Sequence, residues 1–240
     1  MSWTAIVHAH SRRSYDGVGT PAELAEEAVR LGAHVLAITD HDTWAGSIEA
    51  AEHARAGGLP LLVVRGSEVA TDMGDVLALF VEEDPVEKHA LALCDRVHAQ
   101  GGLIVLPHPC RFGAPPPELI GRADLIEVFN ARTPRKANAF AQVLADAAGK
   151  PGTVAPDAHR IEELGLARMV FDGSPPEDLP AVREALLHAP RRFVTHAGSI
   201  WDEWRSQAVK CGRRPDPVLA WHLARGVVRR LVKPAEYRAK

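Results

Sequence analysis

Two histidines close to the start of the chain, His8 and His10, are separated by a single alanine. They follow residues 5–7, a short apolar segment with β-branched side chains that predicts a buried strand. Alternate side chains of a strand point to the same side, so both imidazoles are expected together at its carboxyl end, where they would form half of a metal site. The alternative for an isolated pair is two histidines bonded to backbone carbonyls.

Other residues able to bind metal follow the later apolar segments. Strands are predicted at 35–38, 61–64, 103–106, 125–130 and 152–155, and the residues near or after their ends include Asp40, His41, Glu68, His108, Glu127, Asn130, Asp157 and His159. Imidazoles and carboxylates without cysteine are typical of Zn²⁺, Mn²⁺ or Fe²⁺ sites. Several carboxylates indicate more than one ion, because a bridging carboxylate offsets the repulsion between cations.

Helical segments alternate with these strands. Residues 20–23 combine an N-cap threonine, a proline and a glutamate, and predict a helix that ends near Gly32. Residues 84–87 repeat this chemistry and predict a helix that ends at Gly101, and residues 72–75 predict a turn between two strands. The alternation predicts an α/β fold with a parallel sheet and right-handed crossovers. About seven such units favour a closed or nearly closed TIM-like barrel, whose strand ends share one rim.

The composition restricts the class of protein. The 240 residues carry a net charge of −3, which argues against bulk affinity for nucleic acid. The three cysteines show no disulfide framework, residue 1 leads directly into a strand without a signal-peptide pattern, and no apolar run approaches the ~20 residues of a membrane span. We therefore expect a cytoplasmic protein that does not enter membranes. The sequence does not indicate its oligomeric state.

The character of the chain changes near residue 198. Residues 196–240 hold ten Lys and Arg against four Asp and Glu, and predict helices at 200–211 and 217–231. We expect a barrel at 1–197 and a short helical appendage at 198–240. Trp201, Trp204 and Trp221 in this region would either stack on nucleic-acid bases or pack on the barrel or a partner subunit.

Five motifs, in order, resemble those of the PHP (polymerase and histidinol phosphatase) superfamily. They are H-A-H-S at 8–11, T-D-H-D at 39–42, G-S-E at 66–68, P-H-P at 107–109 and D-A-H at 157–159. The resemblance extends from about Ile6 to Thr195 and implies a distorted (βα)7 barrel with two or three divalent metal ions (Mn, Zn or Fe) that hydrolyses phosphoesters. It implies one ion held by His8, His10, Glu68 and Asp157, a second shared by Glu68 and His108, and a third held by Asp16, His41 and His159.

The segment I-E-V-F-N-A-R at 126–132 resembles single-domain phosphatases of this superfamily that act on nucleotides or small phosphate monoesters. The resemblance implies that Asn130 and Arg132, with Arg111, lie near the substrate phosphate, the alternative for both arginines being an exposed surface position. It also implies catalytic roles for His41 and His159. Asp40 would orient His41 or another ligand, or cap the following helix.

Three positions depart from the family pattern. Asp75 stands where the family usually has histidine, and as a ligand it would add a negative charge that alters metal preference or occupancy. Tyr15 is inserted between Ser14 and Asp16, which shifts the register of that aspartate. Residues 155–156 are Ala-Pro in place of Gly-Ser before Asp157. The third metal site depends most on these positions.

The function predicted from these observations is metal-dependent hydrolysis of a small phosphorylated substrate, such as a nucleotide. The alternatives are a nuclease that acts on short RNA or DNA, and a metal-binding module without activity. An amidohydrolase-type barrel is a further alternative, but it commonly uses a bridging lysine, and no lysine lies between Lys88 and Lys136.

Overall fold

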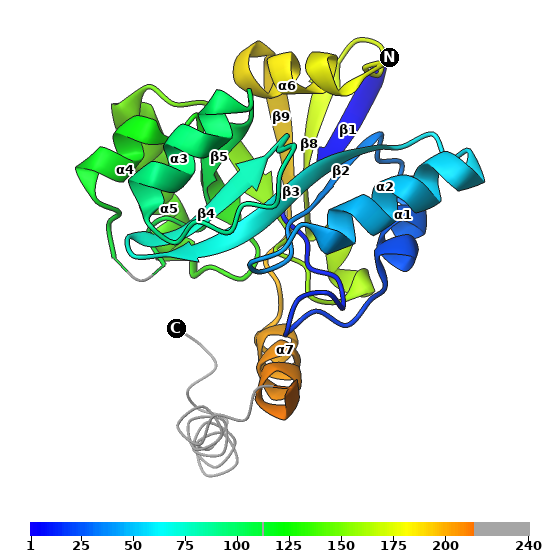
Figure 1. Ribbon diagram of the computed structural model, residues 1–240, viewed down its shortest axis with the longest axis horizontal. Helices are drawn as coiled ribbons and strands as arrows, with labels where there is room; N and C mark the ends of the chain where they lie inside the picture. The colour runs from blue at the N-terminus through cyan, green and yellow to red at the C-terminus, as the bar shows by residue number, and fades with distance from the viewer. Residues whose placement is uncertain (112, 214–240) are drawn as a thin grey trace.

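The computed structural model describes residues 1–111 and 113–213. Their strands form one mixed sheet in the order β7-β6-β5-β4-β3-β2-β1-β8-β9 (Figure 1). The strands are β1 Ser2–Ile6, β2 Val35–Ile38, β3 Leu62–Thr71, β4 Gly74–Leu79, β5 Leu103–Leu106, β6 Leu125–Asn130, β7 Gly152–Ala155, β8 Ala167–Asp172 and β9 Arg191–Thr195.

The sheet curves until the segments after β1 and β7 meet. Ala9 forms an isolated parallel bridge with Ala158, in which His10 N donates to Ala158 O at 2.7 Å. On the other side, Thr39 N donates to Ala9 O at 2.8 Å. The segment after β1 therefore lies between those that follow β2 and β7. The result is a nearly closed barrel, as expected for the TIM-like α/β fold, with the carboxyl ends of these strands at one rim.

The sheet is not parallel throughout, and this part of the prediction was wrong. Strands β1–β2–β3 and β5–β6–β7 are parallel, but β4 runs antiparallel to both β3 and β5, and β8 runs antiparallel to β1 and β9. The link from β3 to β4 is only Asp72 and Met73, with Gly74 at φ +112°, and a parallel crossover needs a dozen or more residues. Glu68 consequently lies inside the long β3 and not after a strand.

Helices surround the sheet: α1 Pro21–Arg30, α2 Ala45–Gly57, α3 Ala90–Ala99, α4 Pro117–Arg122, α5 Arg135–Ala148 and α6 Leu179–His188, with a 3₁₀ helix η1 at Ile161–Leu166. The predicted capping box of α1 is present, because Glu23 N donates to Thr20 Oγ1 and Thr20 N donates to Glu23 Oε2. The predicted start of α3 was wrong. Asp84 accepts a hydrogen bond from Trp44 N, and α3 begins six residues later, at Ala90.

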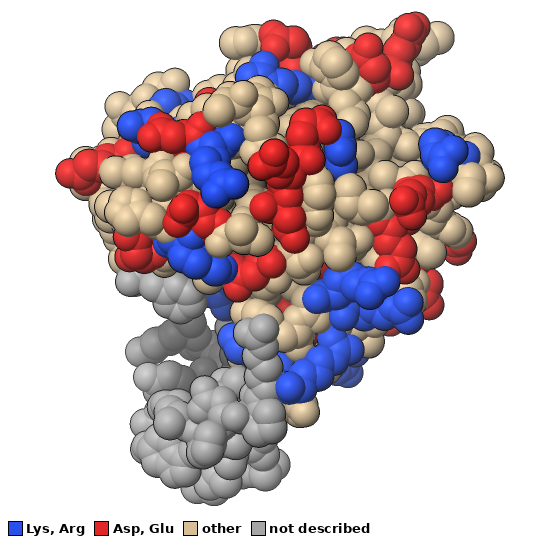
Figure 2. Space-filling model, viewed as in Figure 1, with Lys and Arg blue, Asp and Glu red and all other residues tan. Residues whose placement is uncertain are grey.

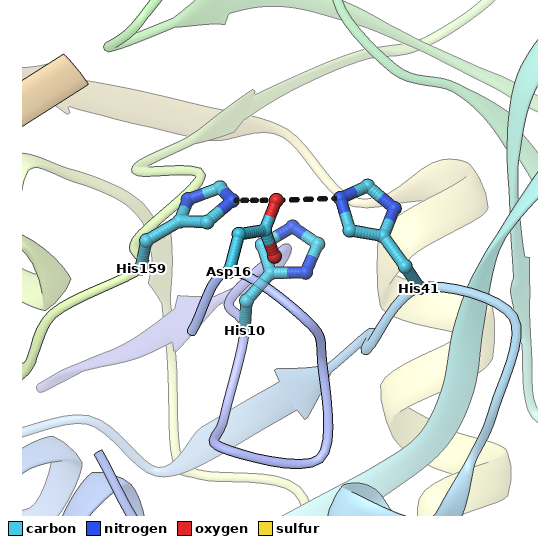
Figure 3. Close-up of side chains that lie close together, drawn as sticks. All are labelled: His10, Asp16, His41 and His159. Atoms are coloured by element: carbon cyan, nitrogen blue, oxygen red, sulfur yellow. Dashed lines mark ion pairs between the residues drawn. The ribbon is translucent and has the colours of Figure 1, made fainter. Parts of the chain in front are cut away.

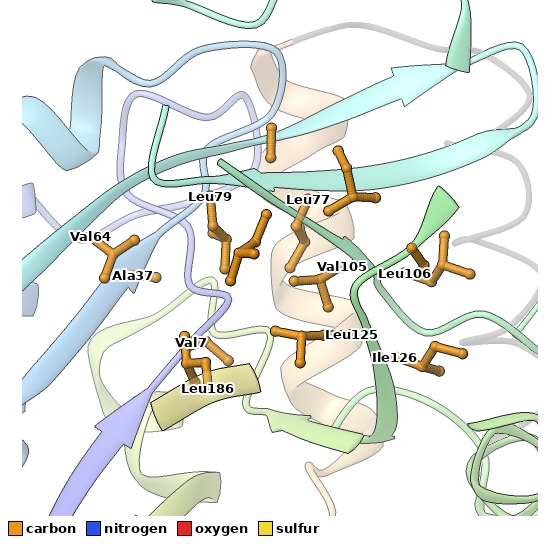
Figure 4. Close-up of a cluster of buried hydrophobic side chains, with 14 of the residues drawn as sticks. Val7, Ala37, Val64, Leu77, Leu79, Val105, Leu106, Leu125, Ile126 and Leu186 are labelled. Atoms are coloured by element: carbon orange, nitrogen blue, oxygen red, sulfur yellow. The ribbon is translucent and has the colours of Figure 1, made fainter. Parts of the chain in front are cut away.

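The interior of the barrel is apolar. Strands β2 and β5 are buried at all four positions, as expected for strands covered on both faces. Leu77, Leu79, Val105 and Leu125 belong to the larger of two buried clusters (Figure 4), and each buried leucine contributes about 1.5–3 kcal/mol to folding. This core supports the rim, where the polar residues lie.

Helix α7 (Ile200–Arg213) lies at the rim end of the barrel, while α6 lies at the opposite end (Figure 1). It matches the first helix of the predicted appendage. The second predicted helix, at 217–231, and Trp221 are outside the described residues, and the boundary at 197 stays a prediction. Trp201 on α7 is exposed. No helix in the described part of the chain is both long and apolar enough to cross a membrane.

Candidate metal centre

His8 and His10 converge as expected, although both lie just beyond the end of β1. Their ring centroids are 5.2 Å apart, and both side chains are buried. Glu127 Oε1 lies 2.6 Å from His8 Nδ1, which leaves His8 Nε2 directed toward Glu68 Oε2 at 3.2 Å. A carboxylate behind an imidazole fixes the ring and its tautomer for a metal ion.

Glu68 stands at the centre of the histidines. Its Oε2 lies 3.2 Å from Nε2 of both His8 and His10 and 3.3 Å from His41 Nδ1, and its Oε1 lies 3.0 Å from His108 Nε2. Burial opposes ionisation of Glu68, but the facing imidazoles outweigh it and hold the pKa of this carboxyl well below its ordinary value. Glu68 is therefore a carboxylate shared by four imidazoles, which is the arrangement of a bridging ligand.

The position of His41 follows from backbone pairing. Glu68 N donates to Asp40 O at 3.1 Å, and Asp42 N donates to Glu68 O at 2.8 Å. These bonds form an isolated bridge between His41 and Glu68. His41, which lies shortly after the end of β2, is thereby placed beside Glu68 in the middle of β3.

A second group of ligand atoms is centred on Asp16 (Figure 3). Its Oδ2 lies 3.3 Å from His41 Nε2 and 3.2 Å from His159 Nε2. Burial, followed by the effect of His10, lowers the pKa of His159 to about 4. For His10, bonding to Asp157 and Glu68 outweighs burial and raises the pKa to about 10. The shifted register around Tyr15 thus still brings Asp16 to the site.

Gly17 shapes the loop that carries Asp16. A Cβ atom at this position would lie 2.1 Å from Ser11 O, so no side chain fits there. The loop is further held by Ser14, whose N donates to Ser11 O at 3.0 Å and whose Oγ accepts from His41 N at 2.8 Å. The glycine-rich loop is therefore folded tightly against the histidines.

Four overlapping sets of ligand atoms, each within 4.8 Å, occur in the described part of the chain. They are His10, Asp16, His41 and His159; His8, His108 and Asp157; His8, His10 and Glu68; and Glu68, Asp75 and His108. Asp16 Oδ1 is buried without a hydrogen-bond partner, and such an orphaned atom is rare unless an ion or water binds it. The donors therefore fit a multinuclear site for divalent cations.

The backbone is strained at this rim. His8, His108 and Asp157 have φ values of +67°, +32° and +48°, a region that residues other than glycine seldom adopt. Each directs a side chain into the cluster from just beyond a strand. Strain of this kind persists where function requires it.

Asp75 lies at the edge of the cluster, beside Glu68 and His108. It pairs in register with Ala70 across the β3–β4 hairpin. Burial and the neighbouring Glu68 raise its pKa. A cation bound to this set would favour the ionised form of Asp75. Asp75 thus lies among the candidate ligand atoms, beside Glu68 and His108.

Asp40 is buried behind the first loop and not among the ligand atoms. Its Oδ1 accepts from Ser11 N at 2.6 Å and Ser14 N at 3.2 Å, and its Oδ2 accepts from Ser11 Oγ at 2.7 Å. A Cβ atom on Gly46 would lie 1.8 Å from Asp40 Oδ2. Asp40 does not cap α2, whose N-cap is Trp44. The geometry favours anchoring of the loop over a contact with reacting groups.

Replacing Asp40 with alanine is expected to lower the free energy of unfolding by about 3 kcal/mol. The change leaves the buried N–H and hydroxyl groups of Ser11 without their acceptor, at a cost of about 1–3 kcal/mol each. Urea denaturation measures the effect. Asp146→Ala, on the exposed face of α5, is the matched control and is expected to change stability by no more than about 0.5 kcal/mol. Equal stability of the two variants would contradict the anchoring role.

The predicted substrate residues occupy different environments. Asn130 is fully buried and donates to Glu127 Oε2 at 3.1 Å and Asp157 Oδ2 at 3.2 Å. Arg132 is not an exposed arginine, because its side chain is only 5% exposed and lies 3.5 Å from Glu163 Oε2. Arg111 Nη1 lies 3.9 Å from Asp157 Oδ2. Both arginines line the cavity above the cluster, whereas Asn130 lies behind it and positions two carboxylates.

The cavity over the cluster has a volume of about 140 Å³ and includes residues that the motifs did not indicate. Tyr15 belongs to this lining and stacks on His41 with a centroid distance of 4.7 Å. Glu163 is not a lining residue, but it accepts a hydrogen bond from His159 N at 2.9 Å. Gln207 and Lys210 of α7 complete the lining. The sequence predicted the helix at 200–211 and its basic composition, but it did not place this helix at the cavity, and nothing in the sequence marked Glu163.

Sequence comparisons relate the chain to known protein families. A model of the PHP domain matches residues 7–101, and a model of the PHP-associated region matches residues 135–189. An uncharacterized protein of Methanocaldococcus jannaschii is 32% identical over 123 residues, which cover 48% of this chain and 69% of that protein. The error-prone DNA polymerase of Nocardia farcinica is 46% identical over 67 residues, which are 28% of this chain but only 6% of the polymerase.

A solved structure shares the fold. The chain superposes with a TM-score of 0.69 on a two-domain protein from Bacteroides vulgatus described as containing a predicted PHP-like metal-dependent phosphoesterase. The sequences are 20% identical, and the match covers 82% of this chain and 65% of the other. This match shows the fold, and the two family models confirm the resemblance stated from the five motifs.

Proposed function

Because the chain belongs to the PHP family, we propose that it is a metal-dependent phosphoesterase that releases phosphate from small phosphomonoesters, nucleotides among them. The observation that carries the proposal is the shared carboxylate of Glu68. It lies within 3.3 Å of four imidazoles, at the rim of the barrel and under an open cavity. Such a centre suits a doubly charged ester, whose uncatalysed hydrolysis is extremely slow.

The donor set suggests two or three ions of Mn²⁺, Zn²⁺ or Fe²⁺. Glu68 with His8, His10, His108 and Asp157 would hold two of them, and the Asp16 group would hold the third. When bound, closely spaced divalent cations lower the pKa of water and neutralise charge on phosphoryl oxygens.

The chain's own groups would then orient the ester. Glu127 and Asn130 keep His8 and Asp157 in place. Arg111, at the rim, would donate from its planar guanidinium to a phosphoryl oxygen. His41 and His159 flank Asp16 and line the cavity, where they would lie near the leaving oxygen.

The test uses protein stripped of metal and then loaded separately with Mn²⁺, Zn²⁺ or Fe²⁺. Each form is assayed for phosphate release from a panel of phosphomonoesters and for cleavage of short single-stranded RNA and DNA. Phosphate release that requires metal supports the proposal. Cleavage of internal diester bonds alone would indicate a nuclease, and metal binding without any hydrolysis would indicate a binding module.

A further inference from the structure

Helix α7 forms one wall of the cavity, although it lies outside both regions that match the family models. Ser206 on this helix is buried and bonds to Arg132 Nη2. At the far end of the helix, Arg213 Nη1 donates to Ser14 O at 3.1 Å and Gly17 O at 2.7 Å. The helix is therefore attached to the loop that carries Asp16 and to a cavity arginine.

Between these attachments, Lys210 faces the cavity. Its Nζ lies 4.9 Å from the centroid of the Tyr15 ring, and the Tyr15 ring stacks on His41 with an interplanar angle of 7°. The ammonium group is thus separated from a predicted metal ligand by a single aromatic ring. Because Lys210 lines the cavity together with His41 and Asp157, its ammonium group lies where it could contact a bound ester.

Lys210 also differs from the other cations of the cavity in its pairing. Arg111 lies near Asp157, and Arg132 lies near Glu163. Among the side chains that the structure describes, no carboxylate oxygen lies within 4.0 Å of Lys210 Nζ. Lys and Arg side chains also gather on the lower part of the face in Figure 2, the part of the view where α7 lies in Figure 1. The charge of Lys210 is therefore available to an anion that enters the cavity.

We propose that Lys210 binds an anionic group of the substrate that does not react, so that α7 determines substrate preference. This inference rests on the proposed phosphoesterase function. The substrate class is a phosphate ester that carries a second negative charge a few bonds from the reacting phosphate. Lysine suits this role because its ammonium is a compact charge on a flexible stem.

The probes are methylphosphonate and phosphonoacetate, which resist hydrolysis and differ by one carboxylate. Calorimetric titration of the Mn²⁺-loaded protein measures both dissociation constants. Lys210→Met, which keeps the stem over Tyr15, is expected to weaken phosphonoacetate binding about tenfold, the value of one charge-assisted hydrogen bond. Methylphosphonate binding is expected to change less than about twofold.

Lys210→Arg keeps the charge and is expected to restore the preference for phosphonoacetate. Arg205→Ala removes one charge from the same helix outside the cavity lining and is expected to bind both probes as the unaltered protein does. Equal weakening of both probes by Lys210→Met, or no weakening, would overturn the role of Lys210 alone. If the unaltered, metal-loaded protein binds neither probe, the proposed function and this inference both fail.

Discussion

Replacing Glu68 with glutamine is expected to lower the metal content of the protein and to reduce its metal-dependent turnover by more than about 100-fold. Loss of residues that merely support metal ligands costs about 10–100-fold, and Glu68 contacts four candidate ligands directly. Glutamine has nearly the same shape but no charge, so it would not offset the repulsion between two cations. Its amide group would also direct N–H donors toward the imidazoles.

Metal analysis by mass spectrometry, together with phosphate release, measures this effect. Glu184→Gln makes the same change on α6, at an exposed position at the opposite end of the barrel, and is expected to keep the metal content and activity of the unaltered protein. A Glu68→Gln variant that retains the full complement of metal would contradict the assignment of Glu68 as a shared ligand.

The metal-free protein is expected to be most stable near pH 6.5 and to lose stability on both sides. Above pH 6.5 the loss of stability comes from His10, whose pKa is about 10 in the folded protein and 6.5 ordinarily. Its contribution is complete below pH 6.5 and is lost as pH rises toward 10. Below pH 6.5 the cause is His159, whose pKa is about 4 in the fold. The unfolded chain then gains a proton that the folded chain does not accept, so stability falls as pH falls toward 4.

Buried carboxylates add to the decline on the acid side. The pKa values of Glu68 and Asp157 are well below their ordinary values, so their contributions are present above those ordinary values and are lost at lower pH. Thermal unfolding of chelator-treated protein across pH 4–10 measures the profile. The Mn²⁺-loaded protein is the control and is expected to stay stable above pH 6.5, because metal ligation requires neutral histidine. An unfolding temperature of the metal-free protein that rises between pH 6.5 and 9.5 would contradict the prediction.

Much of the candidate site could be predicted because it follows from local patterns. The period of two predicted that His8 and His10 would lie together, and they do, although both lie beyond the end of β1. The ends of neighbouring strands share a rim. The backbone itself could not be predicted in the same way. His8 leaves the strand at φ +67°, and no residue pattern signals a left-handed histidine, since the conformation is imposed by the surrounding fold.

Contacts between residues far apart in the sequence explain the features of the fold and site that were not predicted. The turn at residues 72–75 was predicted, but the alternation of strands and helices suggested a parallel sheet, and the turn prevailed because it is too short for a crossover. The burial of Arg132 depends on Glu163, 31 positions away, and on Ser206 of α7. Contacts between residues so far apart in the sequence produce no periodic pattern of apolar and polar residues from which they could be predicted.

The bridge between Ala9 and Ala158 lies beside the candidate metal ligands, so bound metal ions would stabilise the fold as well as the site. It joins the segments that follow β1 and β7, which are far apart along the chain, and the candidate ligands His8, His10 and Asp157 lie next to it. Bound ions would link the segments that follow β1 and β7, and their binding free energy would add to the stability of the closed barrel. The same contacts complete the candidate metal centre and the fold, so a chain whose seventh strand is not yet in place would have no complete set of metal ligands.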